Sequence, residues 1–126
     1  MLKKRQKAIV RKFIEEIYNK GNMAALDDLV DTELIFHGLP EAEDLEDVKL
    51  AISHVRENWN SIFSHLRFTI DEIFIDGDRV IVRLTKRGTF NNTYRQKFHA
   101  GEKLSVPATE IFRISNGKVK EIWANP

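Results

Sequence analysis

The chain has 126 residues with 20 Lys and Arg against 19 Asp and Glu, and its formal net charge is +1. This balance does not favour nucleic acid or an anionic membrane as a partner. The chain has no Cys, which excludes disulfides, thiolate metal ligands and cysteine nucleophiles. Its length predicts a single domain over residues 1–126. Because no apolar run reaches membrane-spanning length, a cytoplasmic protein is the expectation.

The first half of the chain carries the pattern of amphipathic helices. Apolar residues recur every three or four positions over residues 4–19, and Gly21 suits the left-handed position that ends such a helix. A short second helix is expected to start at Asn22. A short strand over residues 33–36 follows, and a third helix, with one long apolar stripe, is expected over residues 48–63.

The second half alternates apolar and polar residues, as strands do. Strands are expected over residues 67–75, 79–90 and 93–100, followed by a terminal hairpin over residues 106–123. The terminal turn is Asn116-Gly117, and an earlier Asp76-Gly77-Asp78 turn joins the first two strands. Helices first and an antiparallel meander afterwards predict an α+β fold with the helices on one side of a sheet.

Glu110 is the main candidate for chemistry. Side chains alternate between the two faces of a strand, so Glu110 shares a face with Phe112 and Ile114. If that face is the core side, burial would raise the pKa of Glu110 and make it a general base or acid. The alternative is a structural carboxylate in salt contact with one of the arginines Arg83, Arg95 or Arg113.

Further candidates would support such a base. His99 and His37 are the two histidines that could donate a hydrogen bond to an enolate oxygen. The four histidines show no H-x-H or HExxH spacing, so no metal site is predicted, and the sequence contains no phosphate loop or nucleophile elbow. The predicted ligand-binding residues, for which plain core packing is the alternative, are Tyr18, Trp59, Phe63, Phe112 and Trp123.

Several short sequence motifs follow one another along the chain. They are Glu16-Ile17-Tyr18-Asn19-Lys20-Gly21-Asn22, Phe36-His37-Gly38, Gly77-Asp78-Arg79-Val80-Ile81-Val82-Arg83, Arg87-Gly88-Thr89, Glu110-Ile111-Phe112-Arg113-Ile114 and Asn116-Gly117-Lys118-Val119-Lys120-Glu121-Ile122-Trp123. In this order and spacing, the chain resembles the SnoaL-like polyketide cyclases of the NTF2-like superfamily over nearly its whole length.

The resemblance implies a cone, in which a curved, mostly antiparallel sheet wraps around three N-terminal helices and encloses a pocket. It also implies a homodimer through the outer sheet face, and acid/base chemistry without cofactor or metal. Glu110 stands where the family commonly has Asp. The family motif Glu-His-Trp-Asp is replaced here by Glu121-Ile122-Trp123-Ala124, so its His and its Asp are both absent.

Three functions are compatible with these residues. The first is a cofactor-free cyclase or isomerase that acts on a small apolar carbonyl compound, with Glu110 as the base. The second is a non-catalytic ligand-binding or dimerisation module on the same cone. The third is an epoxide hydrolase or a hydratase, which ranks lower because such enzymes need further polar groups to hold a water molecule, and only one acid is expected inside the cone.

Overall fold

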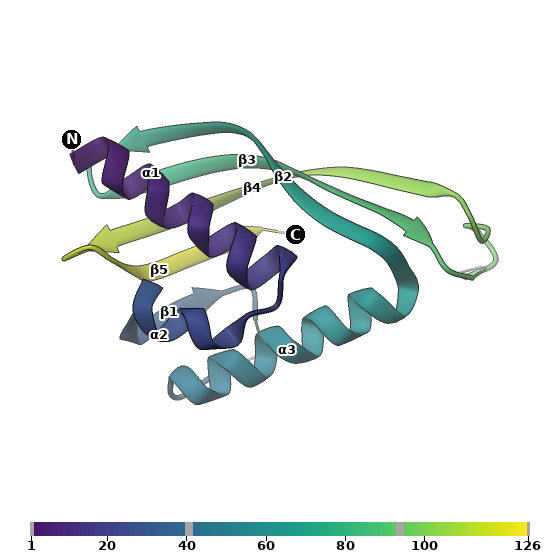
Figure 1. The fold of residues 1–126 in the computed structure, drawn as a ribbon, viewed down its shortest axis with the longest axis horizontal. Helices are drawn as coiled ribbons and strands as arrows, with labels where there is room; N and C mark the ends of the chain where they lie inside the picture. The colour runs from purple at the N-terminus through teal and green to yellow at the C-terminus, as the bar shows by residue number, and fades with distance from the viewer. Residues whose placement is uncertain (1, 40–41, 93–94, 126) are drawn as a thin grey trace.

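The computed structural model describes residues 2–39, 42–92 and 95–125, and these residues form a five-stranded sheet with helices on one face (Figure 1). The strands lie in the order β1-β5-β4-β3-β2. β1 pairs in parallel with β5, whereas every other neighbouring pair is antiparallel, so the sheet is mixed. The strand bounds are β1 Val30–His37, β2 Phe63–Asp76, β3 Arg79–Phe90, β4 Lys103–Ser115 and β5 Lys118–Asn125.

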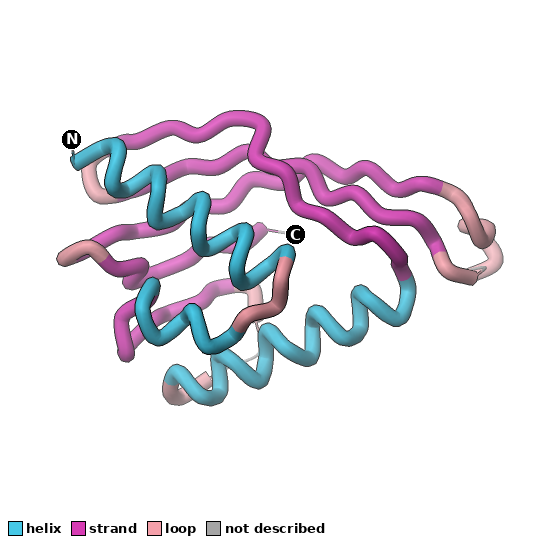
Figure 2. The backbone as a smooth tube through the Cα atoms, in the orientation of Figure 1, coloured by secondary structure: helices cyan, strands magenta, loops and turns pink. Residues whose placement is uncertain are grey.

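The helices lie together on the concave side of the sheet, as the tube view shows (Figure 2). This arrangement confirms the predicted α+β class, and both predicted turns close hairpins, β2 to β3 and β4 to β5. The helices are α1 Leu2–Phe13, which continues as the π-helix η1 Ile14–Asn19, the short η2 Met23–Ala25 and α2 Leu26–Leu29, and α3 Leu45–Ile62.

The core forms where the apolar face of α1 meets the inner face of the central strands. Val10 and Phe13 on α1 are fully buried, as are Val82 on β3, Phe112 on β4 and Ile122 on β5. The rings of Phe13 and Phe112 meet edge to face with their centroids 5.3 Å apart. Burial of these apolar surfaces is the main force that holds helix and sheet together.

β2 bends away from the plane of the other strands and leads directly out of α3 (Figure 1). Its pairing with β3 shifts register between Ser64 and Arg67 and again between Ile70 and Glu72. His65 lies inside the first irregularity with a φ of 56°, a value that regular strands do not adopt. Such bulges curve a strand and increase its twist, so β2 arches over α3 and leaves space beneath it.

The strand expected over residues 93–100 is the main error in the sequence-based prediction of the fold. β3 and β4 are instead neighbours in one long hairpin, and the intervening residues form its tip. Arg95 and Gln96 have φ values of 53° and 55°, which end any extended strand there. Phe98 stacks on Phe90 at 4.9 Å, and this contact folds the tip back on itself. Residues 93–94 of the expected strand lie outside the described residues.

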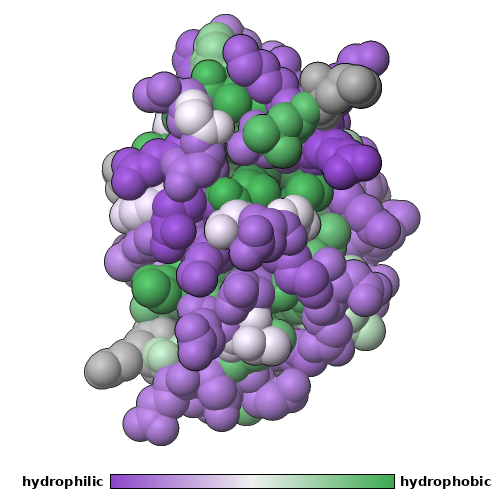
Figure 3. All heavy atoms as spheres, turned by 90° about the vertical axis from the view of Figure 1, so that its left-hand side faces the viewer, coloured by the Kyte–Doolittle hydropathy of each residue, from purple (hydrophilic) through white to green (hydrophobic). Residues whose placement is uncertain are grey.

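The end of the molecule near the N-terminus is largely hydrophilic, and hydrophobic residues are visible there in areas surrounded by hydrophilic ones (Figure 3). This agrees with the interspersed positive and negative residues of the sequence. Among the described helices, none combines the length and the apolar character that a membrane crossing requires.

We expect Phe112→Ala to lower the free energy of unfolding by about 3–5 kcal/mol, because it removes a fully buried ring and leaves a cavity against Phe13. Phe74→Ala is the matched control, since 48% of the Phe74 side chain is exposed and its loss should cost about 1 kcal/mol or less. Urea denaturation of both variants measures the difference. Equal losses would contradict this placement of the core.

Candidate active site

A cavity of about 240 Å³ lies between α3, the end of the first helix and the inner face of the sheet. Most of its walls are apolar, which suits a small organic ligand, although the volume lies below the roughly 300–1,000 Å³ of drug-sized pockets. The lining residues come from every layer of the fold: Tyr18, Phe36, Gly38, Leu39, Ile52, Val55, Arg56, Trp59, Leu66, Phe68, Lys86, Glu110 and Ala124.

Glu110 is the carboxylate of this cavity, and it is almost entirely buried with 3% of its surface exposed. It lies on the inner face of β4 together with Phe112 and Ile114, as the alternation of the strand predicts. The hydroxyl of Tyr18 donates a 2.6 Å hydrogen bond to Oε1 of Glu110. The hydrogen-bond partner of Glu110 is therefore a phenol, and the structure does not favour the alternative of a salt contact with an arginine.

The environment of Glu110 changes the acidity of both members of this pair. Burial raises the pKa of Glu110, and the hydrogen bond from Tyr18 and the positive charge of Lys86 partly oppose that rise. Burial also raises the pKa of Tyr18 well above its usual range, and the neighbouring Glu110 charge and hydrogen bond add to it. Tyr18 is thus a neutral hydrogen-bond donor, and Glu110 is a carboxylate that takes up a proton more readily than one in water.

The π-helix η1 places Tyr18 at this position. The amide of Lys20 donates to the carbonyl of Glu15 five residues earlier, which widens the last turn of the helix. π-helical turns are rare and often occur at functional sites. Here the turn brings Tyr18 over the sheet, where its ring contacts those of Phe13 and Phe68 at 5.4 and 5.2 Å.

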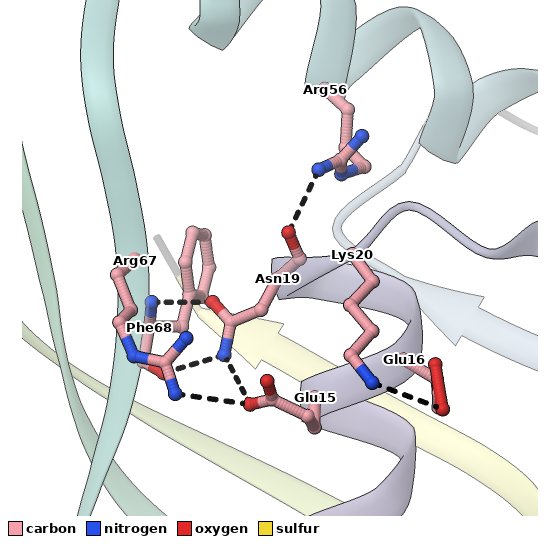
Figure 4. A network of polar contacts seen from close by, with 7 residues as sticks. All are labelled: Glu15, Glu16, Asn19, Lys20, Arg56, Arg67 and Phe68. Atoms are coloured by element: carbon pink, nitrogen blue, oxygen red, sulfur yellow. Dashed lines mark hydrogen bonds and ion pairs between the residues drawn. The ribbon is translucent and has the colours of Figure 1, made fainter.

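Asn19 fixes the end of this helix to β2 (Figure 4). Its side-chain amide donates to the carbonyl of Phe68 at 2.9 Å and accepts from the amide of Phe68 at 2.7 Å, as a neighbouring strand would. Glu15 extends the network, since it accepts from both Asn19 and Arg67. Tyr18 is therefore anchored through its sequence neighbour.

Arg56 ties the same helix end to α3. Its guanidinium donates to the carbonyls of Tyr18 and Asn19 at 3.2 and 3.1 Å, and Figure 4 shows the contact with Asn19. These carbonyls are the free acceptors at the end of a helix, so the cation also matches the negative end of the helix dipole. Arg56 also lines the cavity, and its Nε and Nη2 atoms make these two structural contacts.

Lys86 is a cavity residue that the sequence analysis did not single out. Its ammonium lies 5.1 Å from the ring centroid of Trp59 and 5.4 Å from that of Phe68, so it is held by cation–π contacts. The signal was present in the strand pattern. Lys86 continues the inward series of Val82 and Leu84, and a lysine at a core-facing position is unusual.

The remaining wall comes from the end of β1 and from β5. Gly38 has a φ of 104°, and a Cβ at that position would lie 2.5 Å from the carbonyl oxygen of Ala124. Only glycine allows this close approach of the two chain segments. Gly38, Leu39 and Ala124 consequently close this side of the cavity.

The structure corrects the expected positions of His37 and Trp123, which lie on the outer face of the sheet. His37 pairs in register with Trp123, and their rings stack at 5.4 Å. Nε2 of His37 lies 2.6 Å from a carboxylate oxygen of Glu121 and not in the cavity. A register shift between Arg113 and Ile114 in the β4–β5 pairing turns Trp123 outward.

The structure also separates the other predicted residues from the cavity. His99 is exposed in the tip of the β3–β4 hairpin, and the described residues 95–100 do not form the strand that was expected over residues 93–100. Phe63 is buried against Phe90 at 4.7 Å, and Phe112 packs in the core. Of the candidate site residues, Tyr18, Trp59 and Glu110 line the cavity. No group of three or more potential metal ligands occurs among the described side chains.

Comparison with known proteins places the chain in a protein family. The family model described as SnoaL-like polyketide cyclase matches residues 8–126. A search of curated proteins gives no match.

Several solved structures share the fold. TsrD from Streptomyces laurentii is 24% identical, with a TM-score of 0.72, and the match covers 96% of this chain and 87% of that one. IdmH from Streptomyces antibioticus is 19% identical, with a TM-score of 0.76 and coverages of 95% and 90%. A protein with a ketosteroid isomerase-like fold from Catenulispora acidiphila is 16% identical, with a TM-score of 0.68 and coverages of 94% and 84%.

We expect Glu110 to make the free energy of unfolding depend on pH. Because burial raises its pKa in the folded state, the folded protein retains a proton that the unfolded chain has released. Its contribution to stability is therefore lost as the pH rises from the ordinary carboxyl value of roughly 4.3 through the raised pKa. The loss reaches at most about 1.4 kcal/mol for each pH unit in that window.

Glu110→Gln tests this linkage, because glutamine has a similar shape and accepts the Tyr18 hydrogen bond but does not ionise. Urea denaturation between about pH 4 and pH 8, a range chosen to span the ordinary carboxyl value, should show the variant gaining on the wild type as the pH rises. Glu102→Gln, an exposed carboxylate in the hairpin tip, is the control and should not change the profile. Parallel profiles for Glu110→Gln and wild type would rule out a raised pKa.

Proposed function

Because the chain belongs to the SnoaL-like polyketide cyclase family, we propose that it catalyses cofactor-free acid/base chemistry on a small apolar carbonyl compound. The observation that carries the proposal is the buried carboxylate of Glu110, held by Tyr18 at the wall of an apolar cavity. A base removed from water binds a proton more tightly, and apolar walls keep competing water away from it.

The two oxygens of Glu110 have different surroundings. Oε1 accepts the hydrogen bond from Tyr18, whereas no hydrogen bond to Oε2 is found among the described residues. Oε2 would remove a proton from a carbon next to the ligand carbonyl, and the bonding electrons would move onto the carbonyl oxygen to give an enolate. Tyr18 fixes the direction of the carboxylate throughout, because its own pKa keeps it protonated.

The proton on Glu110 then completes either of two reactions. In an aldol-type cyclisation, the enolate carbon attacks a second carbonyl of the same molecule and Glu110 returns the proton to the new alkoxide. In an isomerisation, Glu110 returns the proton to a different carbon. Both reactions need one carboxylate that changes protonation state twice, which a residue with a raised pKa can do near neutral pH.

Proton exchange tests this function without knowledge of the natural substrate. We expect the protein to accelerate hydrogen–deuterium exchange at the α-carbon of small cyclic ketones in D2O, followed by NMR. Glu110→Gln should lower the accelerated rate by about 10²–10⁴-fold, the usual contribution of a general base. Glu102→Gln on the exposed hairpin tip should retain it.

The same experiment separates the proposed function from its alternatives. Ligand binding without any exchange, in both wild type and Glu110→Gln, would favour the non-catalytic binding module. Hydration of an alkene or opening of an epoxide in place of exchange would favour the hydratase or hydrolase. Dialysis against a chelator should leave the exchange rate unchanged if the chemistry needs no metal.

We also propose the homodimer that the family resemblance implies, through the outer face of the sheet. That face carries the stacked His37 and Trp123, with Arg79 5.0 Å over the Trp123 ring. Sedimentation velocity should give twice the monomer mass of 14.7 kDa. Trp123→Asp would shift the distribution to monomer, and a monomeric wild type at all concentrations would contradict the dimer.

A further inference from the structure

The charged residues around the cavity leave Lys86 without a carboxylate partner. Arg56 donates to backbone carbonyls, and Glu110 accepts from Tyr18. Lys86 forms no ion pair within 4.0 Å among the described residues, although its charge still acts on Glu110. Lys86 is thus a cation in the wall of the cavity that has no ion-pair partner among the described residues.

The ammonium of Lys86 is also held in a defined place. The rings of Trp59 on α3 and Phe68 on β2 lie 5.1 and 5.4 Å from it, and all three residues line the cavity. A half-buried ammonium beside apolar walls attracts an anion more strongly than an exposed lysine does, because less water screens the charge. Holding the ammonium in advance also reduces the entropy lost on binding.

We propose that Lys86 binds a carboxylate of the ligand, so that the cavity selects small apolar keto acids over neutral ketones. This inference rests on the proposed function, because it concerns the same cavity and assigns Glu110 the carbonyl end of the same ligand. Lys86 is then the specificity-determining residue, and it binds the ligand at a distance from the reacting carbon.

The strand register supports separate binding of the two ends of the ligand, the carboxylate by Lys86 and the carbonyl by Glu110. Lys86 pairs with Val106 and Val82 pairs with Glu110, so the two charged residues stand four positions apart along the β3–β4 ladder. At about 3.3 Å per residue this is about 13 Å between their backbone positions. The charge of Lys86 still acts on Glu110, but its ammonium forms no ion pair with that carboxylate within 4.0 Å, so it is suited to a second polar group elsewhere on the ligand.

The chemistry of the site favours a single carboxylate over a phosphate. Lys86 supplies one positive charge, and Arg56 is engaged with the carbonyls of Tyr18 and Asn19. The lining residues Trp59, Phe68, Leu66 and Val55 would surround the rest of the ligand with apolar side chains. A small ring or short chain with one carboxylate matches both features.

Trp59 provides the readout, because it contacts Lys86 directly and the chain has two Trp. In a Trp123→Phe background, Trp59 becomes the sole tryptophan and reports binding by its fluorescence. The probes are cyclohexanecarboxylate and cyclohexanecarboxamide, which have nearly the same shape but differ in charge. We expect the carboxylate to bind at least about tenfold more tightly than the amide at neutral pH.

Lys86→Met should abolish this preference while the amide binds as before, because methionine keeps an unbranched apolar side chain and loses the charge. Lys97→Met is the matched control: Lys97 also lies over an aromatic ring, that of Phe98 at 5.9 Å, but in the hairpin tip away from the cavity. It should keep the preference. Equal binding of the two probes to wild type, no saturable binding of the carboxylate, or a preference that survives Lys86→Met would overturn the proposal.

Glu110→Gln distinguishes this inference from the proposed function. The variant removes a negative charge from the cavity, so it should keep or increase the carboxylate preference while it loses proton exchange. A wild type that shows the preference but no exchange would refute the catalytic function and leave the carboxylate site standing. Exchange on neutral ketones that falls with Lys86→Met would instead place Lys86 at the enolate and overturn its assignment as a carboxylate anchor.

Discussion

A buried carboxylate is costly to a protein, and the hydrogen bond from Tyr18 to Glu110 makes this one tolerable. The contact joins the first helix to the fourth strand, and the elements around it hold the two residues in place. The π-helical turn brings Tyr18 over the sheet, Asn19 fixes that turn to β2, and Arg56 fixes it to α3. The polar residues at this end of the cavity therefore all help to hold Tyr18 against Glu110.

The curvature of the sheet decides where a cavity can exist. Val82 and Phe112 are fully buried under α1 and pack there in the hydrophobic core. Farther along, the bulges in β2 arch the strand over α3, and the larger separation of the layers is lined by Trp59 and Phe68. The same chain thus builds a solid core at one end of the sheet and a cavity at the other.

Side-chain positions that depend on local periodicity could be predicted from the sequence, whereas those that depend on bulges could not. The inward position of Glu110 follows from alternation in an unbroken stretch of β4. Simple alternation would place Trp123 on the same face as Val119, which is a core residue. The bulge between them puts Ile122 in the core instead and turns Trp123 outward. A one-residue shift of register moves every later side chain to the opposite face of the sheet, and no local sequence pattern indicates such a shift.

Tyr18 and Glu110 are 92 residues apart in the sequence, and β1 pairs with β5 although the other three strands lie between them in the chain. Contacts of such long range must wait for most of the chain to be ordered, which slows folding relative to proteins built from local contacts. No partly folded fragment that lacks either end can hold the Tyr18–Glu110 pair. Activity that depends on this pair would therefore be found only in molecules in which both segments have reached their folded positions.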